Sequence, residues 1–130
     1  ILADWSTRNV LKRVSLPEKI TISKKDEFQN LGKWKFNELN NASTLRVQTT
    51  CKMDTIQPTL LVYQIMRNGE SVKWEAMKLE RQMECSGKFN QLLFMRNLSD
   101  VQKEDEVILY YWNFSKATIV LKDTKLEFLN

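Results

Sequence analysis

A chain of 130 residues, of which 42% are hydrophobic and 28% charged, has the length and composition of one globular domain with a substantial core. Its net charge of +4 arises from 20 basic and 16 acidic residues that are interleaved along the chain, whereas nucleic-acid-binding domains gather their basic residues in a patch or stripe. These values argue against a nucleic-acid partner, and the lack of any run of about 18 apolar residues argues against a membrane-spanning segment.

The chain begins Ile1-Leu2-Ala3-Asp4 rather than with a methionine. We expect residues 1–130 to form a single domain that either belongs to a longer protein or has lost a leader. The 3 glycines and 2 prolines are too few for a flexible linker between two domains.

The first half of the chain contains strand signals of unequal strength. Short strands are predicted at residues 10–16 and 19–23, whereas residues 27–39 show no clean period of either kind. Residues 45–53 alternate clearly between apolar and polar positions, as expected of a half-buried strand. The face predicted to be buried carries Leu45, Val47, Thr49, Cys51 and Met53.

A β-hairpin is predicted around Asn68-Gly69, which separates two β-prone runs at residues 60–67 and 70–79. Asn-Gly is the strongest short hairpin signal because both residues readily adopt the positive φ of a two-residue turn. With regular pairing, Tyr63 faces Trp74, and both side chains are expected in the core.

Three further strands are predicted in the C-terminal part, at residues 88–94, 106–112 and 118–128. If the last two form a hairpin with Trp112 opposite Thr118, one face is strongly apolar. Beyond it, either a bulge near Asp123-Thr124 returns Leu126 and Phe128 to the core, or both faces are partly covered. The apolar face consists of Val107, Leu109, Tyr111, Ile119 and Leu121.

Seven or eight short strands separated by turns predict an all-β fold. We expect an antiparallel two-sheet β-sandwich with Greek-key or jelly-roll winding, of the galactose-binding-like kind.

The residues needed for most catalytic mechanisms are missing. The chain has no histidine, which removes the commonest general base and metal ligand, and it has neither a Cys-x-x-Cys motif nor a glycine-rich phosphate loop. Paired carboxylates could cleave glycosides, but solvated surface charge is the simpler interpretation of those present. We predict that the domain is not an enzyme. The carboxylates considered are Glu75, Glu80, Glu104, Asp105 and Glu106.

Aromatic side chains are the remaining candidates for binding a ligand. Tyr110 and Trp112 lie on the face opposite the most apolar one, and Asn113 follows directly. Sugars present apolar C–H faces that stack on such rings, so Tyr110 and Trp112 are candidate glycan contacts, with Asn113 placed to orient a hydroxyl. Core packing of the two rings, and a turn role for Asn113, are the alternatives.

The linked segments of residues 45–129 resemble a group of β-sandwich domains from secreted or envelope-anchored proteins of Bacteroidetes, which are similar to jelly-roll carbohydrate-binding modules. The resemblance rests on Leu61-Val62-Tyr63-Gln64-Ile65 with Asn68-Gly69 and Trp74, on residues 86–91, on residues 105–113 and on residues 123–128. It departs from the group at Phe89, where the group usually has Trp, and at Lys122, where it usually has an acid.

The resemblance implies a periplasmic, cell-surface or secreted location and a glycan as ligand. In sugar-binding jelly rolls, adjacent acids in the closing strand often hold a structural calcium ion, but only Asp123 is retained here, so a calcium site is doubtful. Cysteine count alone leaves open one disulfide or two thiols, and an oxidising location favours a Cys51–Cys85 disulfide.

Two hypotheses follow. The first is a non-catalytic accessory or binding module of an envelope or secreted protein, with glycan as the favoured ligand. The second is a structural or protein-interaction domain, in which an apolar patch or an exposed strand edge meets another domain or protein of the cell envelope.

Overall fold

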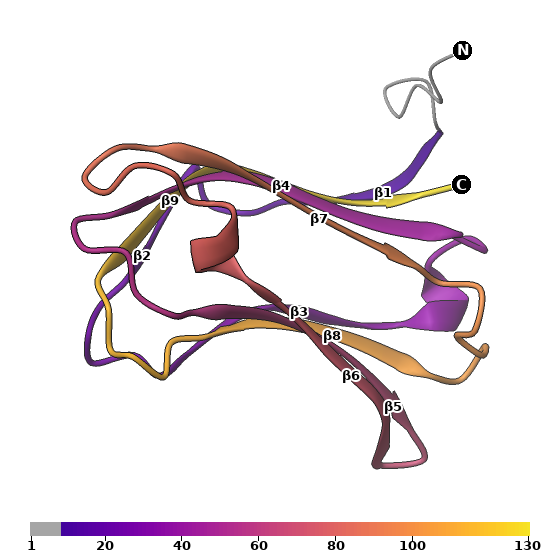
Figure 1. Ribbon diagram of the computed structural model, residues 1–130. Coiled ribbons are helices and arrows are strands. Elements are labelled where there is room, and N and C mark those ends of the chain that lie inside the picture. Colours follow the sequence, from indigo (N-terminus) through magenta and orange to yellow (C-terminus); the bar gives the residue numbers. More distant parts are fainter. Residues whose placement is uncertain (1–8) are drawn as a thin grey trace.

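The computed structural model describes residues 9–130, in which nine β-strands form two sheets that pack face to face (Figure 1). The two helical elements of these residues are short 3₁₀ turns, and neither is long or apolar enough to cross a membrane. The elements are β1 (Val10–Val14), β2 (Lys19–Ile22), β3 (Phe28–Lys35), η2 (Phe36–Glu38), β4 (Thr44–Met53), β5 (Leu60–Arg67), β6 (Glu70–Lys78), η3 (Leu79–Arg81), β7 (Asn90–Asn97), β8 (Glu106–Trp112) and β9 (Ile119–Leu129).

The strand order is that of a jelly roll. Sheet A runs β1-β9-β4-β7, with β2 also paired to β9, and sheet B runs β3-β8-β5-β6. All strand pairs are antiparallel, and the chain crosses repeatedly from one sheet to the other. This arrangement confirms the predicted all-β, two-sheet sandwich and its jelly-roll winding.

The core lies between the inner faces of the two sheets. The alternation predicted for β4 is confirmed, because Leu45, Cys51 and Met53 are fully buried. Large rings join the two layers: Tyr63 of sheet B packs edge-on against Phe94 of sheet A, with ring centroids 6.5 Å apart. Burial of these apolar faces is the main stabilising contribution to such a sandwich.

The predicted hairpin of the last two strands is wrong, since β8 lies in sheet B and β9 in sheet A. The connecting loop cannot be a simple turn, because it carries the chain from one layer to the other. The inward faces were nevertheless predicted correctly: Leu109, Tyr111 and Leu121 are fully buried. The bulge is confirmed by a register shift opposite Gln48–Thr50 and by the positive φ of 53° at Asp123.

The β5–β6 hairpin has the predicted turn but a different register. Asn68 and Gly69 have φ values of 51° and 79°, and Arg67 pairs with Glu70 as expected. A bulge then leaves Val72 without a partner, which shifts all later pairs by one residue. Tyr63 therefore faces Glu75 and is buried as predicted, whereas the predicted core position of Trp74 is wrong.

The free edge of sheet A at β7 is partly covered by a side chain. The Gln82 amide donates to the Leu93 carbonyl at 2.9 Å, and its oxygen accepts the Leu93 N–H at 2.8 Å. Gln82 follows η3, so this short turn places the amide beside the strand. Sheet B, by contrast, ends in the β5–β6 hairpin, whose turn projects beyond the rest of the sandwich (Figure 1).

Candidate functional site

Five aromatic side chains gather on the outer face of sheet B, and we call them the aromatic cluster. The register explains their meeting: Phe28 of β3 lies opposite Trp112 of β8, and Tyr110 shares the face of Trp112 because side chains alternate along a strand. The β6 bulge turns Trp74 to the same outer face, opposite Gln64. The members of the cluster are Phe28, Trp74, Tyr110, Trp112 and Phe114.

Trp112 lies at the centre of the cluster and contacts three other rings. Its ring is stacked near Phe28, at 6.0 Å between centroids and 14° between planes. Phe114 and Trp74 meet it edge-on at 5.4 Å and 6.4 Å. The Trp74 indole N–H donates to the Tyr110 hydroxyl at 3.2 Å, and this hydrogen bond holds the exposed Trp74 ring beside Tyr110. The rings of the cluster are thus packed against one another.

The cluster has an exposed rim and a covered floor. Phe28, Trp74 and Phe114 are 53%, 45% and 44% exposed, which is high for side chains of this size. Val62 is fully buried although its register partner Tyr110 places it on the outer face. The rings therefore cover apolar surface beneath them while offering their own faces to solvent.

The indole N–H of Trp112 is buried and has no hydrogen-bond partner among the described residues. Leaving such a donor unpaired costs about 1–3 kcal/mol. The position of this ring is therefore set by packing against its aromatic neighbours.

Of the predicted ligand contacts, the structure brings Tyr110 and Trp112 together but not Asn113. The Asn113 side chain is fully buried; its amide donates to the Ala117 carbonyl at 2.7 Å and accepts the Ala117 N–H at 3.0 Å. It also donates to the Asp26 carbonyl at 3.2 Å. Asn113 thus holds the loop between β8 and β9, which is the turn role considered as its alternative.

Sequence reasoning missed Phe28, Trp74 and Phe114 as members of the cluster. Phe114 directly follows Asn113, and its apolar side chain in a polar loop was the available signal. Phe28 lies in the segment without a clean period, because a register shift between Asn30 and Gly32 interrupts the alternation of β3. Trp74 was missed because the bulge at Val72 in β6 was not recognised from the sequence.

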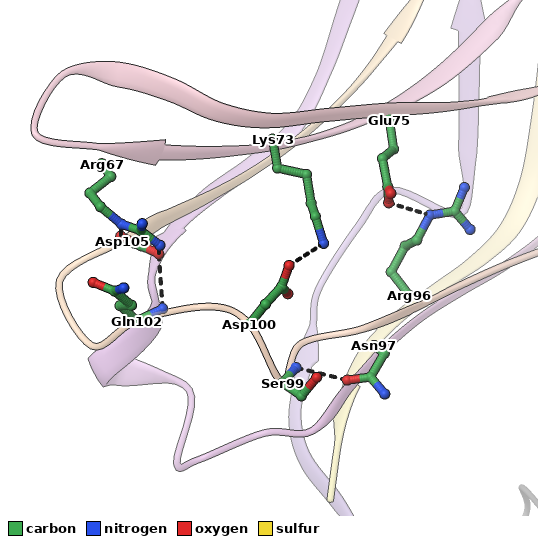
Figure 2. Close-up of polar contacts among 9 residues, drawn as sticks. All are labelled: Arg67, Lys73, Glu75, Arg96, Asn97, Ser99, Asp100, Gln102 and Asp105. Atoms are coloured by element: carbon green, nitrogen blue, oxygen red, sulfur yellow. Dashed lines mark hydrogen bonds and ion pairs between the residues drawn. The ribbon is translucent and has the colours of Figure 1, made fainter.

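A set of ion pairs joins β6 and the end of β5 to the β7–β8 loop and to β7 (Figure 2). Lys73 and Glu75 occupy inward positions of β6 and reach Asp100 and Arg96 at 2.5 Å and 3.0 Å. These ion pairs link β6 of sheet B to β7 of sheet A and to the loop that follows it, on the side where the β5–β6 hairpin diverges from sheet A (Figure 1). A small pocket of about 260 Å³ remains beside Lys73 and Asp100.

Asp105 is the most buried acid of this set. Arg67 donates to both of its carboxylate oxygens at 2.8 Å, and the backbone N–H of Gln102 donates to one of them at 2.8 Å. The Arg67 hydrogen bonds hold the pKa of Asp105 below its usual value, against the effect of burial. The interpretation of this acid as a solvated surface charge is therefore wrong, and its role is to fix the loop.

The cysteines and the predicted cation ligand are separate from the aromatic cluster. Cys51 and Cys85 are free thiols, one inside the core and the other exposed, so the structure does not join them in the expected disulfide. Asp123 lies exposed at the β9 bulge. Across residues 9–130, no group of three or more His, Cys, Asp or Glu side chains is arranged to hold a metal ion.

No known protein family and no curated protein matches the sequence. Among solved structures, the fold is similar to the CBM22-1 xylan-binding domain of Xyn10C from Paenibacillus barcinonensis, with a TM-score of 0.47 and 13% identity over 75% of this chain and 64% of that one. Dimeric latent PorU from Porphyromonas gingivalis is more distant, with a TM-score of 0.37 and 11% identity over 93% of this chain and 11% of PorU. The chain thus spans less than two thirds of either protein. The fold and the site define a jelly-roll β-sandwich with an aromatic cluster on one outer face.

Proposed function

We propose that the chain is a non-catalytic binding domain of an envelope or secreted protein and that its aromatic cluster binds a glycan. The observation that carries this proposal is the group of half-exposed rings, Phe28, Trp74 and Phe114, held in place by Tyr110 and Trp112. A packed set of exposed aromatic faces suits the apolar C–H faces of sugar rings, and little side-chain entropy is lost on binding.

Hydrogen-bonding groups lie around the rings, as sugar recognition requires. Asn30 is exposed and pairs with Tyr110 across β3 and β8. Gln64 pairs with Trp74, and its amide donates to the Ser71 hydroxyl at 2.9 Å, which leaves the amide oxygen for a ligand. The Tyr110 hydroxyl accepts the Trp74 N–H and keeps its own proton to donate. Rings and polar rim together form the kind of surface that binds a polyhydroxylated chain.

The test begins with the purified domain on a glycan array, with calcium and with a chelator. Xylan and other neutral polysaccharides are included as probes, and the two conditions also show whether calcium contributes. Binding to one glycan class, lost in Trp112→Ala, is the expected result. Silence under both conditions would overturn the proposal.

Trp112 contacts several rings, so Trp74→Ala provides a second variant with less effect on folding. We expect it to weaken neutral-glycan binding about tenfold or more while the melting temperature stays close to that of the wild type. The matched control is Val10→Ala, since Val10 is 38% exposed but belongs to β1 of the other sheet. Loss of folding in Trp112→Ala would identify that ring as a packing residue.

A protein partner is the second candidate function. It is favoured by the ring geometry, because Trp74 and Phe114 meet Trp112 at 83° and 62° and so do not form one flat platform. In that case the array is silent, and the domain self-associates or binds a neighbouring domain through the cluster. Solution mass as a function of concentration, for wild type and Trp74→Ala, distinguishes this outcome.

A further inference from the structure

Lysines gather on the outer face of sheet A, whereas the aromatic cluster lies on the outer face of sheet B. We call Lys19, Lys52, Lys122 and Lys125 the lysine patch. Lys19 of β2 lies directly opposite Lys122 of β9, while Thr50 and Gln48 of β4 pair with Lys122 and Lys125. Lys52 is two residues beyond Thr50 and therefore shares its face.

The positive charge of the lysine patch is not compensated. Like charges directly opposite each other on neighbouring strands destabilise a sheet. None of the four lysines forms an ion pair within residues 9–130, whereas Glu127, at the other end of β9, is bound by both Arg13 and Arg46. In the sequence, Glu18, Asp54 and Asp123 lie within two residues of these lysines, and Glu127 is already paired with its arginines. The four lysines therefore exceed the acids left to balance them.

An exposed aromatic ring lies within this patch. The Nζ atoms of Lys122 and Lys52 are 4.6 Å and 5.9 Å from the centre of the Phe89 ring. Phe89 is 41% exposed, so part of its ring is accessible beside the two ammonium groups.

A hollow adjoins the patch where the β9 bulge bends the sheet. It has a volume of about 460 Å³, and its lining includes Gln48, Gln91, Asp123 and Lys125, with Gln82 at the β7 edge. The Gln82 amide is occupied by the Leu93 backbone. The amides of Gln48 and Gln91 have no partner among the described residues, so their donors and acceptors are free to bind hydroxyl groups.

We propose that this face of sheet A is a second binding site, which takes an anionic polysaccharide bearing carboxylates, such as a polyuronate. The ammonium groups of Lys19, Lys122 and Lys125 neutralise its carboxylates, the free amides bind its hydroxyls, and Phe89 stacks on a sugar face. The free amides of Gln48 and Gln91 beside the lysines favour a polyuronate, which presents hydroxyl groups between its carboxylates.

The experiment uses the full chain with polygalacturonate and, as a matched ligand, the same polymer after complete methyl esterification, which removes its charges. Binding is measured by calorimetry at low and high salt. We expect saturable binding to the acidic polymer only, weakened by salt because the contacts are exposed ion pairs. Neutral glycans bound by the aromatic cluster show no such salt dependence.

The variants are Lys122→Gln and a charge-matched control, Lys103→Gln, which neutralises an exposed lysine of the β7–β8 loop. Lys122→Gln is expected to weaken polyuronate binding about tenfold, with an unchanged or higher melting temperature because it relieves the repulsion from Lys19. Lys103→Gln is expected to change binding by less than about twofold. Should Lys122→Gln misfold, Lys19→Gln carries the same test.

Three outcomes would overturn the proposal. They are the absence of saturable binding to polygalacturonate, an equal loss in Lys103→Gln, and tighter binding to single-stranded DNA of the same charge than to the polyuronate. The second would show a net-charge effect, and the third would show a nucleic-acid site. Trp74→Ala separates the two faces, because it is expected to leave polyuronate binding intact whatever it does to neutral glycans.

Discussion

Arg67 donates two hydrogen bonds of 2.8 Å to the two carboxylate oxygens of Asp105. The carboxylate is buried, whereas the Arg67 side chain is 32% exposed. The pair joins the end of β5 to the loop that precedes β8. Since β8 carries Tyr110 and Trp112, this ion pair helps to fix the strand on which the aromatic cluster is built.

Asp105→Asn tests how much this ion pair contributes to the stability of the fold. We expect the free energy of unfolding to fall by about 1.5–3 kcal/mol, because charge-assisted hydrogen bonds to a buried carboxylate are lost while Arg67 keeps partial access to water. Asp100→Asn is the matched control: Asp100 pairs with Lys73 but is 57% exposed, so a loss of at most about 1 kcal/mol is expected. Urea denaturation measures both, and equal losses would contradict the distinction.

Below about pH 8, stability is expected to depend on pH only in acid. Arg67 and Lys73 hold the pKa values of Asp105 and Asp100 below 3.8; at Glu127 burial opposes the shift, but hydrogen bonds from Arg46 and Arg13 hold the pKa below 4.5. Groups with a lowered pKa in the folded state stabilise it above their unfolded pKa, and this stability is lost as the pH falls through the folded pKa. The melting temperature should therefore be level from about pH 8 to 5 and fall below about pH 4.5. A decline already at pH 6 would contradict this assignment.

Gly32→Ala is expected to destabilise the fold. A Cβ at this position would overlap ring carbons of Trp34, which packs edge-on against Phe128 at 5.1 Å. Displacing the ring should lower the free energy of unfolding by about 1–3 kcal/mol, as overpacking does elsewhere. In a Trp34→Ala background the same change should cost little. A double-mutant cycle measured by chemical denaturation tests this, because additive losses would show that Gly32→Ala does not act through the Trp34 ring.

Thiol chemistry distinguishes the two cysteines. Burial raises the pKa of Cys51 to about 12, so this thiol is protonated at neutral pH, whereas Cys85 is exposed. A thiol reagent should therefore modify one cysteine in the folded protein and two after unfolding. Protein purified from an oxidising compartment that shows no free thiol after unfolding would instead establish the Cys51–Cys85 disulfide.

The sequence predicts most of the fold because the relevant patterns are local. Alternation in residues 45–53 identifies the buried face of β4, and Asn68-Gly69 identifies the turn, since each depends on neighbours in the chain. Which sheet a strand joins depends on distant pairing, and the loop at Asn113 therefore looked like a hairpin connection. In the structure it crosses between the two layers.

The candidate site was harder to predict because bulges have no reliable sequence signature. The unpaired Val72 reverses the facing of Trp74, and the shift after Asn30 obscures the strand that carries Phe28. The outward facing of Tyr110 and Trp112 could be predicted because β8 alternates without interruption. The turn role of Asn113 was open to sequence reasoning because Ala117 is only four residues away, whereas its hydrogen bond to the Asp26 carbonyl becomes visible only when the fold is assembled.

The Gln82 amide, which occupies both backbone hydrogen-bonding groups of Leu93, also affects how molecules meet at high concentration. A strand from another copy that aligned with β7 would find the Leu93 position already filled, which weakens the pairing of a further strand along that edge. In concentrated solution, strand addition at a sheet edge is a route to fibril-like aggregation. One glutamine outside the strand thus opposes edge-to-edge pairing at β7.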